Sequence, residues 1–471
     1  MELNEESIRS LVEQVVTGLK NSGAQENLFR FTGLFSDMDA AVWAARQAQR
    51  ELIEGTLVMR REAVKNLRRV ILDNLEQLSK MAVEETGFGR VEDKIEKNRL
   101  AAEMTPGPED LGPDSWSDDH GLMIVERAPY GVIGAISPST NPSESIINNG
   151  ISMLSGGNTV VFNSHPSARK VSAYTVGLMN DAVRKAGGPD NVFCTLTEPT
   201  IETATNMMNH PLIDLLVVTG GPGVVRAAMK TDKKVIAAGP GNPPVVVDET
   251  ADLEKAAKDI VAGAGFDNNI ICIDEKEIIA VRSIADALKE EMAKNGAYEL
   301  KGGEIEKVTT LVVADPGRPG HEGSPNREYV GRDASVIAKK AGLEVPESTR
   351  ILLMEVDKSH PLVWTEQLMP VIPLVRVDNV DEAIDFALEC EHGFRHTASM
   401  HSLNIAKLSK MAKVMNCSLF VKNGSNFNGM AAGGAGFTSY TIASPTGEGF
   451  TRARTFTRER RCSLIDYFRI V

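Results

Sequence analysis

Cysteine is the residue type in this chain best suited to nucleophilic chemistry, and one cysteine has distinctive neighbours. Cys272 lies in the run AGAGFDNNIICIDEKE, where small residues and amides precede it and let the backbone approach a ligand closely. Taken alone, a cysteine between two isoleucines is more often a buried core residue. The cysteines are widely spaced and form no CxxC pair, so they indicate neither a disulfide framework nor a zinc knuckle and fit a reducing compartment. They are Cys194, Cys272, Cys390, Cys417 and Cys462.

Two loop segments carry groups that could assist such a nucleophile. Asn141 lies in AISPSTNPSESIINNG, just after an apolar run typical of a strand, and its amide could donate to a developing oxyanion. The alternative is an ordinary turn, because Ser-Pro and Asn-Pro are common loop dipeptides. The run TGGPG from Thr219 to Gly223 ends one strand and begins a helix, so its backbone N–H groups could face a pyrophosphate. It is not the GxGxxG fingerprint and is weak as a motif.

A group of histidines in the C-terminal part has side chains of a type that can bind a metal ion. His392 and His396 are four residues apart, with Glu391 and His401 nearby. Gly393 interrupts the pair, the region is typical of a loop before a strand, and no HExxH-like ligand set appears. We expect no metal site.

Composition bounds the class of protein. The chain has 471 residues, which suggests two or three domains of about 100–200 residues each. Hydrophobic residues make up 42% and charged residues 24%, as in ordinary globular proteins, and no apolar run approaches the roughly 18 residues that would span a membrane. The net charge of −13 argues against a nucleic-acid partner, since phosphates require a basic surface.

The elements that would position these residues alternate between strand and helix. Residues 38–107 are mainly helical in pattern. A first series then has strands over 131–137, 159–163, 191–196, 214–219 and 234–238, with helices over 168–185, 201–209 and 223–229. A second series has strands over 245–248, 277–281, 351–355, 371–377, 397–401 and 417–421, with helices over 252–265, 284–295, 380–390 and 403–414. This alternation predicts an α/β protein with two doubly wound parallel sheets, joined at a Gly/Pro-rich hinge over 238–244 with a ligand cleft between them.

The chain resembles the aldehyde dehydrogenase superfamily over nearly all of residues 32–471. Within it, the chain is most similar to the CoA-acylating propionaldehyde and acetaldehyde dehydrogenases of bacterial microcompartments. The runs that carry the resemblance match in order and spacing. They are ERAPYGVIGAISPSTNP, LSGGNTVVFNSHPSA, VVTGGPGVV, AAGPGNPPVVVD, FDNNIICIDEKE, WTEQLMPVIPLV, GFTSYTIASPTGEG and FTRERRC.

The resemblance implies a division into parts. It implies an NAD- and CoA-binding domain over 32–239 with an oligomerisation excursion near 108–130. A catalytic domain follows over 240–430, and a C-terminal segment over 431–471 includes an oligomerisation strand. A homodimer or homotetramer with closed symmetry is expected.

The resemblance also assigns roles by motif. Cys272 matches the nucleophile, Asn141 and the backbone N–H of Cys272 match the oxyanion hole, and Glu366 matches the contact to the nicotinamide-side ribose. The remaining cofactor-binding positions are Ser137, Pro138, Ser139, Thr140, Asn163, His165, Pro166, Thr219, Gly220, Gly221, Val224, Ala238, Gly239 and Leu368.

Two departures from the family pattern bear on which molecule accepts the acyl group. Hydrolytic members carry a glutamate base in a run like LELGG, and here that position is Ala237. Without a base for water, a thiol acceptor is favoured, since a thiol of pKa about 8.5 is already partly thiolate near neutrality. The usual KPSE-like contact to the adenosine ribose is replaced by Asn163-Ser-His-Pro166, which fits a site that also admits the 3′-phosphate of CoA, with His165 as a candidate contact.

These departures predict a ping-pong oxidation of a short aldehyde, propanal or acetaldehyde, by NAD and then CoA through a cysteine thioester. Three alternatives stay open. The first is a hydrolytic enzyme with another base, such as Glu144 or Asp274. The second is a phosphate-linked reductase, and the third is a non-catalytic cargo or scaffold protein that kept the fold.

The first 20 residues form a separate pattern. Apolar residues at three- and one-residue spacing predict an amphipathic helix over 1–20, and the polar stretch over 21–31 predicts a linker. The acidic start argues against secretory and mitochondrial targeting signals. The helix would either pack on the enzyme body or enter a partner's groove. It resembles encapsulation peptides, which implies docking on shell proteins and a cytoplasmic location inside a bacterial microcompartment.

Overall fold

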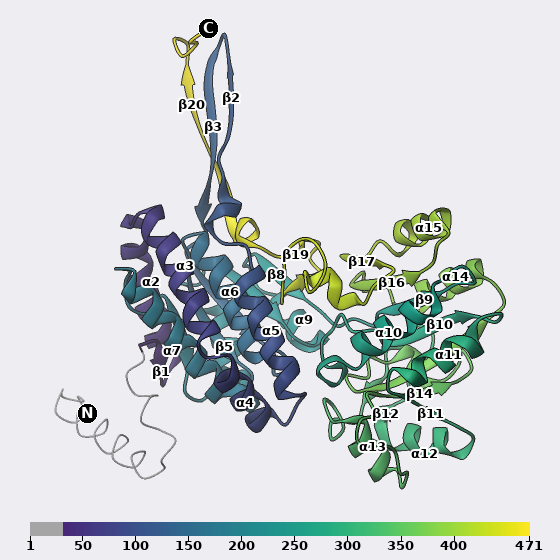
Figure 1. Ribbon diagram of the computed structural model, residues 1–471. Coiled ribbons are helices and arrows are strands. Elements are labelled where there is room, and N and C mark those ends of the chain that lie inside the picture. The colour runs from purple at the N-terminus through teal and green to yellow at the C-terminus, as the bar shows by residue number, and fades with distance from the viewer. Residues whose placement is uncertain (1–31) are drawn as a thin grey trace, which may run out of the picture.

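The computed structural model describes residues 32–471, and the predicted helix over 1–20 and linker over 21–31 lie outside the described residues. Two parallel sheets, each with its own helices, make up the body of the protein (Figure 1). Among the described residues, no helix has both the length and the apolar character needed to cross a membrane.

The first unit is built on a six-stranded parallel sheet in the order β1-β6-β5-β4-β7-β8. Its strands are β1 (Leu34–Phe35), β4 (Val132–Ser137), β5 (Thr159–Ser164), β6 (Phe193–Leu196), β7 (Leu215–Thr219) and β8 (Val235–Ala238). The chain runs outward from β4 through β5 to β6 and then returns to the other side of β4 as β7. The order therefore reverses between β4 and β7, and ligands bind at the carboxyl ends of strands at such a switch point.

Helices cover both faces of this sheet because its buried side chains alternate in direction along each strand. Ile133 and Ala135 face one cluster that includes α3 to α7, whereas Val132 faces a second cluster with α2 and α8. The helices are α2 (Met38–Glu54), α3 (Leu57–Leu72), α4 (Leu75–Thr86), α5 (Val91–Met104), α6 (Pro142–Ser155), α7 (Arg169–Lys185), α8 (Ile201–Asn209) and α9 (Pro222–Ala228).

The second unit is built on a seven-stranded parallel sheet in the order β11-β14-β15-β10-β9-β16-β17. Its strands are β9 (Pro244–Val247), β10 (Glu277–Val281), β11 (Ala297–Leu300), β14 (Ile351–Glu355), β15 (Val371–Val377), β16 (Thr397–His401) and β17 (Leu419–Lys422). Its helices are α10 (Leu253–Ala264), α11 (Ala285–Lys294), α12 (Gly303–Val312), α13 (Ala334–Lys340), α14 (Val380–Cys390) and α15 (Ile405–Met415). Central strands β9 and β10 are buried on both faces, which explains their continuous apolar runs.

An antiparallel three-stranded sheet projects from the body (Figure 1). Strands β2 (Asp114–Asp118) and β3 (Gly121–Pro129) form a hairpin, and β20 (Thr457–Ile465) pairs along the whole of β3. Most of β20 is exposed, including the apolar side chains of Leu464 and Ile465. The smaller pairs are β12 (Val313–Asp315) with β13 (Ser324–Pro325) and β18 (Ile442–Ala443) with β19 (Gly449–Phe450).

Helix α6 is the main element that the sequence did not predict. Every residue of Pro142–Ser155 is buried although many are polar, so its polar side chains do not mark a solvent-facing side. Its buried amides are satisfied by partners far along the chain. Asn148 Nδ2 donates to Thr105 Oγ1 at 2.8 Å, and Asn148 Oδ1 accepts from the backbone N–H of Tyr440 at 3.0 Å. Pro142 at the first helical position was the one local signal.

Candidate active site

A cavity of about 760 Å³ lies between the two units. Its wall combines the segments that follow β4, β5, β7 and β8 with the Cys272 loop and loops near 322–327 and 366–368 of the second unit. The cavity therefore occupies the switch point of the first sheet. It is lined by all the predicted site residues: Cys272, Asn141, Ser137, Pro138, Ser139, Thr140, Asn163, His165, Pro166, Thr219, Gly220, Gly221, Val224, Ala238, Gly239, Glu366 and Leu368.

The backbone that carries Cys272 has an unusual shape. The cysteine follows the 3-10 helix η4 (Phe266–Asn269) and precedes β10. Asp267, Asn268 and Asn269 have φ values of 44°, 57° and 63°, three left-handed residues in a row. Asp and Asn adopt this conformation more readily than other side chains, which explains the residue types in DNN.

Two buried charged side chains hold that loop in place. Lys276 Nζ donates to Asn269 O at 2.8 Å, to Asn269 Oδ1 at 2.7 Å and to Ile271 O at 3.1 Å. Asp274 Oδ2 accepts from the backbone N–H of Ile271 at 3.1 Å. Because the loop is fastened on both sides of Cys272, the thiol is presented to the cavity from a fixed backbone.

The surroundings of the Cys272 thiol favour its protonated form. Burial, the Glu366 carboxylate and Asp274 raise the pKa of Cys272 to about 12, and Lys276 opposes them. Burial also raises the pKa of Glu366 to about 7, and Lys276 opposes that shift. The Gly241 N–H donates to Glu366 Oε1 at 3.4 Å.

Asn141 occupies the N-cap position of α6 but does not cap the helix with its side chain. Its Nδ2 makes one long hydrogen bond, to Thr140 Oγ1 at 3.3 Å, and its Oδ1 has no partner within the described residues. The side chain is only 6% exposed. A buried amide with so few partners is available to a ligand in the cavity.

The remaining wall suits a polar ligand. Ser137 Oγ and Ser164 Oγ are buried without hydrogen-bond partners in the part of the chain that the structure describes, and both line the cavity. A Cβ added at Gly221 would meet no atom within 4 Å, so the backbone of this turn faces open space. Thr219 Oγ1 lies 3.1 Å from Thr441 Oγ1, which ties the same turn to the C-terminal segment. These features fit a dinucleotide, which presents many acceptors to backbone and hydroxyl groups.

Two charged residues of the cavity were missed by sequence reasoning. Glu322 and Arg327 flank β13 in a stretch without apolar period, so no local signal placed them there. His165 and Arg327 are the basic side chains that line this cavity. Burial and the neighbouring Arg327 charge lower the pKa of His165, so the imidazole is mainly neutral at neutral pH. His165 Nδ1 accepts from the backbone N–H of Ser167 at 3.2 Å.

The cavity offers no carboxylate at position 237. Ala237 is buried in β8, and its N–H donates to Thr446 Oγ1 at 3.1 Å. The carboxylates that line the cavity are Glu322 and Glu366. Glu144 and Asp274, the alternative bases, are both buried and neither lines the cavity, and Glu144 lies 3.6 Å from Lys97 Nζ. Neither is placed to activate water in the cavity.

The histidine group near residue 396 is engaged in local hydrogen bonds. The backbone N–H of His396 donates to Glu391 Oε1 at 2.7 Å, and His392 Nε2 lies 3.0 Å from Trp364 O. Over residues 32–471 no group of three or more His, Cys, Asp or Glu side chains is placed to hold a metal ion.

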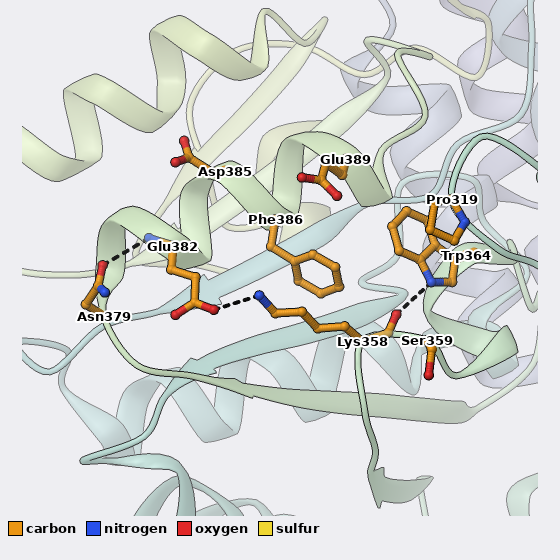
Figure 2. Close-up of a pocket in the computed structure, with 9 residues that line it drawn as sticks. All are labelled: Pro319, Lys358, Ser359, Trp364, Asn379, Glu382, Asp385, Phe386 and Glu389. Atoms are coloured by element: carbon orange, nitrogen blue, oxygen red, sulfur yellow. Dashed lines mark hydrogen bonds and ion pairs between the residues drawn. The ribbon is translucent and has the colours of Figure 1, made fainter.

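A second hollow, of about 510 Å³, lies beside α14 (Figure 2). Lys358 Nζ pairs with Glu382 Oε1 at 2.7 Å and lies over the Phe386 ring, and Trp364 Nε1 donates to Lys358 O at 2.7 Å. None of the predicted site residues lines it. Its side chains include no cysteine, and Cys272 lines the larger cavity.

Comparison with known proteins agrees with this geometry. The model of the aldehyde dehydrogenase family matches residues 32–444. The acetylating acetaldehyde dehydrogenase EutE of Salmonella typhimurium is 47% identical over 470 residues, which cover 100% of both chains.

Two solved structures are similar along most of the chain. The Rhodopseudomonas palustris propionaldehyde dehydrogenase with bound CoA and an acylated cysteine is 50% identical, with a TM-score of 0.89 over 92% of this chain and 98% of that one. A propionaldehyde dehydrogenase from the Clostridium phytofermentans fucose utilisation bacterial microcompartment is 45% identical, with a TM-score of 0.90 over 93% of this chain and 100% of that one. The predicted fold class is confirmed, and the chain belongs to the aldehyde dehydrogenase family.

Proposed function

We propose that the protein oxidises a short aldehyde with NAD and passes the acyl group from Cys272 to coenzyme A. The observation that favours CoA over water as the acyl acceptor is the alanine at position 237, where hydrolytic members have a glutamate base. The carboxylates that line the cavity are Glu322 and Glu366. Water needs a base to attack a thioester, whereas a thiol is itself a good nucleophile. Relatives named for acetylation, and one with bound CoA and an acylated cysteine, support the same reading.

The residues of the cavity can carry each step. The Cys272 thiol gives up its proton to solvent in the cavity and its sulfur adds to the aldehyde carbon. The oxygen that gains negative charge is held by Asn141 Nδ2 and the Cys272 backbone N–H. Bound NAD would accept the hydride from that carbon, and an acyl thioester would remain on Cys272. The CoA thiol then loses its proton and its sulfur adds to the thioester carbonyl. The Cys272 sulfur leaves and is protonated again, and acyl-CoA is released. Acetaldehyde and propanal are the substrates that the relatives' names favour.

The two ligands would use the same cavity in turn. The glycine turn at Thr219–Gly221, Ser137 and Glu366 would hold NAD. Asn163, His165 and Pro166 would hold the adenosine end of CoA, with Arg327 as the permanent cation for its 3′-phosphate.

The test measures NADH formation from propanal with CoA, without CoA, and with desulfo-CoA, which has every CoA group except the sulfur. We expect turnover only with CoA and acyl-CoA as the product. Equal turnover without CoA would mean that a base for water exists in the cavity. Absence of turnover together with NADPH-dependent reduction of an acyl phosphate would favour the phosphate-linked reductase, and NAD binding without any turnover would favour a scaffold protein.

We further propose how the chain is organised for assembly. Residues 32–239 bind the cofactors, 240–430 carry the nucleophile, and the β2–β3 hairpin within 108–130 joins β20 of 431–471 in a sheet that contacts a second copy. The exposed apolar residues of β20 support that contact in a homodimer or homotetramer.

Residues 1–20 are proposed to dock on shell proteins and to direct the enzyme into a cytoplasmic microcompartment. A relative from such a compartment supports the proposal. Removing residues 1–20 should leave the specific activity within about twofold, because the cavity lies in the described body, but should abolish co-purification with shell proteins. A chain lacking residues 21–31 instead, with the helix sequence retained, is the matched control. Unchanged shell association of the first deletion would contradict the proposal.

A further inference from the structure

Two lysines of α5 are buried completely. Lys94 and Lys97 are one helical turn apart, share one face of the helix and have an exposed fraction of 0%. Burying a charge is costly unless it is paired and hydrogen-bonded, so both ammonium groups must have partners.

Both lysines meet the same carboxylate. Asp267 Oδ2 lies 2.6 Å from Lys97 Nζ and 3.0 Å from Lys94 Nζ, and it is also fully buried. Asp267 Oδ1 accepts from the Arg90 N–H at 2.8 Å. A Cβ at Gly89 would lie 1.8 Å from Asp267 Oδ1, so a glycine is required for this approach. The start of α5 is thereby fixed against η4.

The same ammonium groups reach a second loop. Lys94 Nζ and Lys97 Nζ each lie 3.4 Å from Thr140 O, and Lys97 Nζ lies 3.6 Å from Glu144 Oε1 in the first turn of α6. Burial lowers the pKa of Lys97, but Asp267 and Glu144 outweigh it and hold that pKa above its ordinary value. These carboxylates therefore favour the charged form of Lys97.

The cluster connects the two halves of the active site. Asp267 begins the left-handed run that leads to Cys272, and Thr140 directly precedes Asn141. The nucleophile and the amide come from different sheets, and no strand pairing links them. We propose that Lys97, with Lys94 and Asp267, is a positioning residue that sets the separation between the Asn141 amide and Cys272.

This inference rests on the proposed function, because it assigns a role in forming the acyl thioester. A loosened separation should slow that step, since displacing a reacting group by about 1 Å costs up to about 10²-fold. NAD affinity should change little, because the cluster reaches only the backbone oxygen of Thr140 among the predicted cofactor-binding residues, and the structure records no contact from it to Thr219, Gly220 or Ser137. A general loss of folding would weaken both.

The experiment compares Lys97→Met with the double variant Lys97→Met, Asp267→Asn. The cluster holds two lysines and two carboxylates, and the double change removes one of each, so its formal charge stays balanced. Asn also tolerates the left-handed backbone at position 267. Lys80→Met, at an exposed lysine paired with Glu76 on α4, is the matched control. The readouts are the single-turnover rate of NADH formation from propanal without CoA, and the dissociation constant for NAD.

We expect both variants to lose about tenfold or more in the single-turnover rate, with NAD affinity within about twofold of the parent and Lys80→Met unchanged. A rate within threefold of the parent in either variant would overturn the inference. So would full recovery in the double variant, since it would mean that charge balance alone matters. If Lys97→Met does not fold, the balanced double variant decides. A parent enzyme without CoA-dependent turnover would refute the proposed function instead.

Discussion

Replacing Cys272 by alanine should lower the rate of NADH formation from propanal by on the order of 10⁴-fold or more, with or without CoA. The hydride can leave the substrate carbon only after the sulfur has added to it, and no other cysteine lines the cavity. The change deletes one partly buried sulfur from a loop that Lys276 and Asp274 hold independently. The fold and NAD affinity should therefore be retained.

The matched control is Cys417→Ala, a second partly buried thiol that lies outside the cavity. Its turnover should equal that of the parent. Mass spectrometry of the parent mixed with propanal and NAD, without CoA, should show a propanoyl adduct on Cys272 that the alanine variant lacks. An adduct on another residue, or turnover retained in the alanine variant, would refute the assignment of the nucleophile.

Much of the scaffold was predictable because its signals are local. The strands around the switch point are buried apolar runs bounded by Gly, Pro and Asn, and β4, β5, β7 and β8 begin and end within a residue or two of the predicted ranges. The helices over 38–107 and most of the second α/β series follow from period and caps, but β11, α12 and α13 were not predicted. Helix α6 was not predicted, because its polar residues are buried together with its apolar ones and so do not mark a solvent-facing side.

The site was predictable in part for a different reason. The residues around Cys272 do not by themselves show whether it is a nucleophile or a core cysteine. The resemblance to a known family over many segments favours the nucleophile. In the structure, Cys272, Asn141 and Glu366 line one cavity. Glu322 and Arg327 lie in a loop whose sequence has no helical or strand period, so the sequence did not show that they line the cavity.

The Lys97–Asp267 pair joins residues 170 positions apart. The residue types Asp-Asn-Asn are compatible with a left-handed backbone, but they do not show which distant lysine will pair with the Asp267 carboxylate. Such pairings are fixed by the packing of α5 against η4, which no local pattern encodes. They are also the contacts that hold the two reacting loops together, so the least predictable part of the site is the part that sets its geometry.

Replacing Asn141 by alanine should lower the rate of NADH formation by about 10²- to 10³-fold, the usual cost of one oxyanion-hole donor. An N-cap asparagine normally also stabilises its helix, and its loss would confuse the result. Here the Asn141 side chain makes no capping hydrogen bond, and Pro142 already fixes the first turn of α6. The loss should therefore fall on the chemical step, with the thermal midpoint and NAD affinity little changed.

Asn209→Ala is the matched control, since it removes an exposed amide that bonds within its own helix, to Thr205 O. It should keep the parent rate. The decisive comparison is alkylation of Cys272 by iodoacetamide, followed by mass spectrometry to separate it from the exposed Cys462. Alkylation forms no oxyanion at a carbonyl, so Asn141→Ala should be alkylated at the parent rate while its NADH formation is lost. If both rates fall together, Asn141 acts by holding the Cys272 loop and not by binding the oxyanion, because only a displaced thiol would slow a reaction that needs no amide donor.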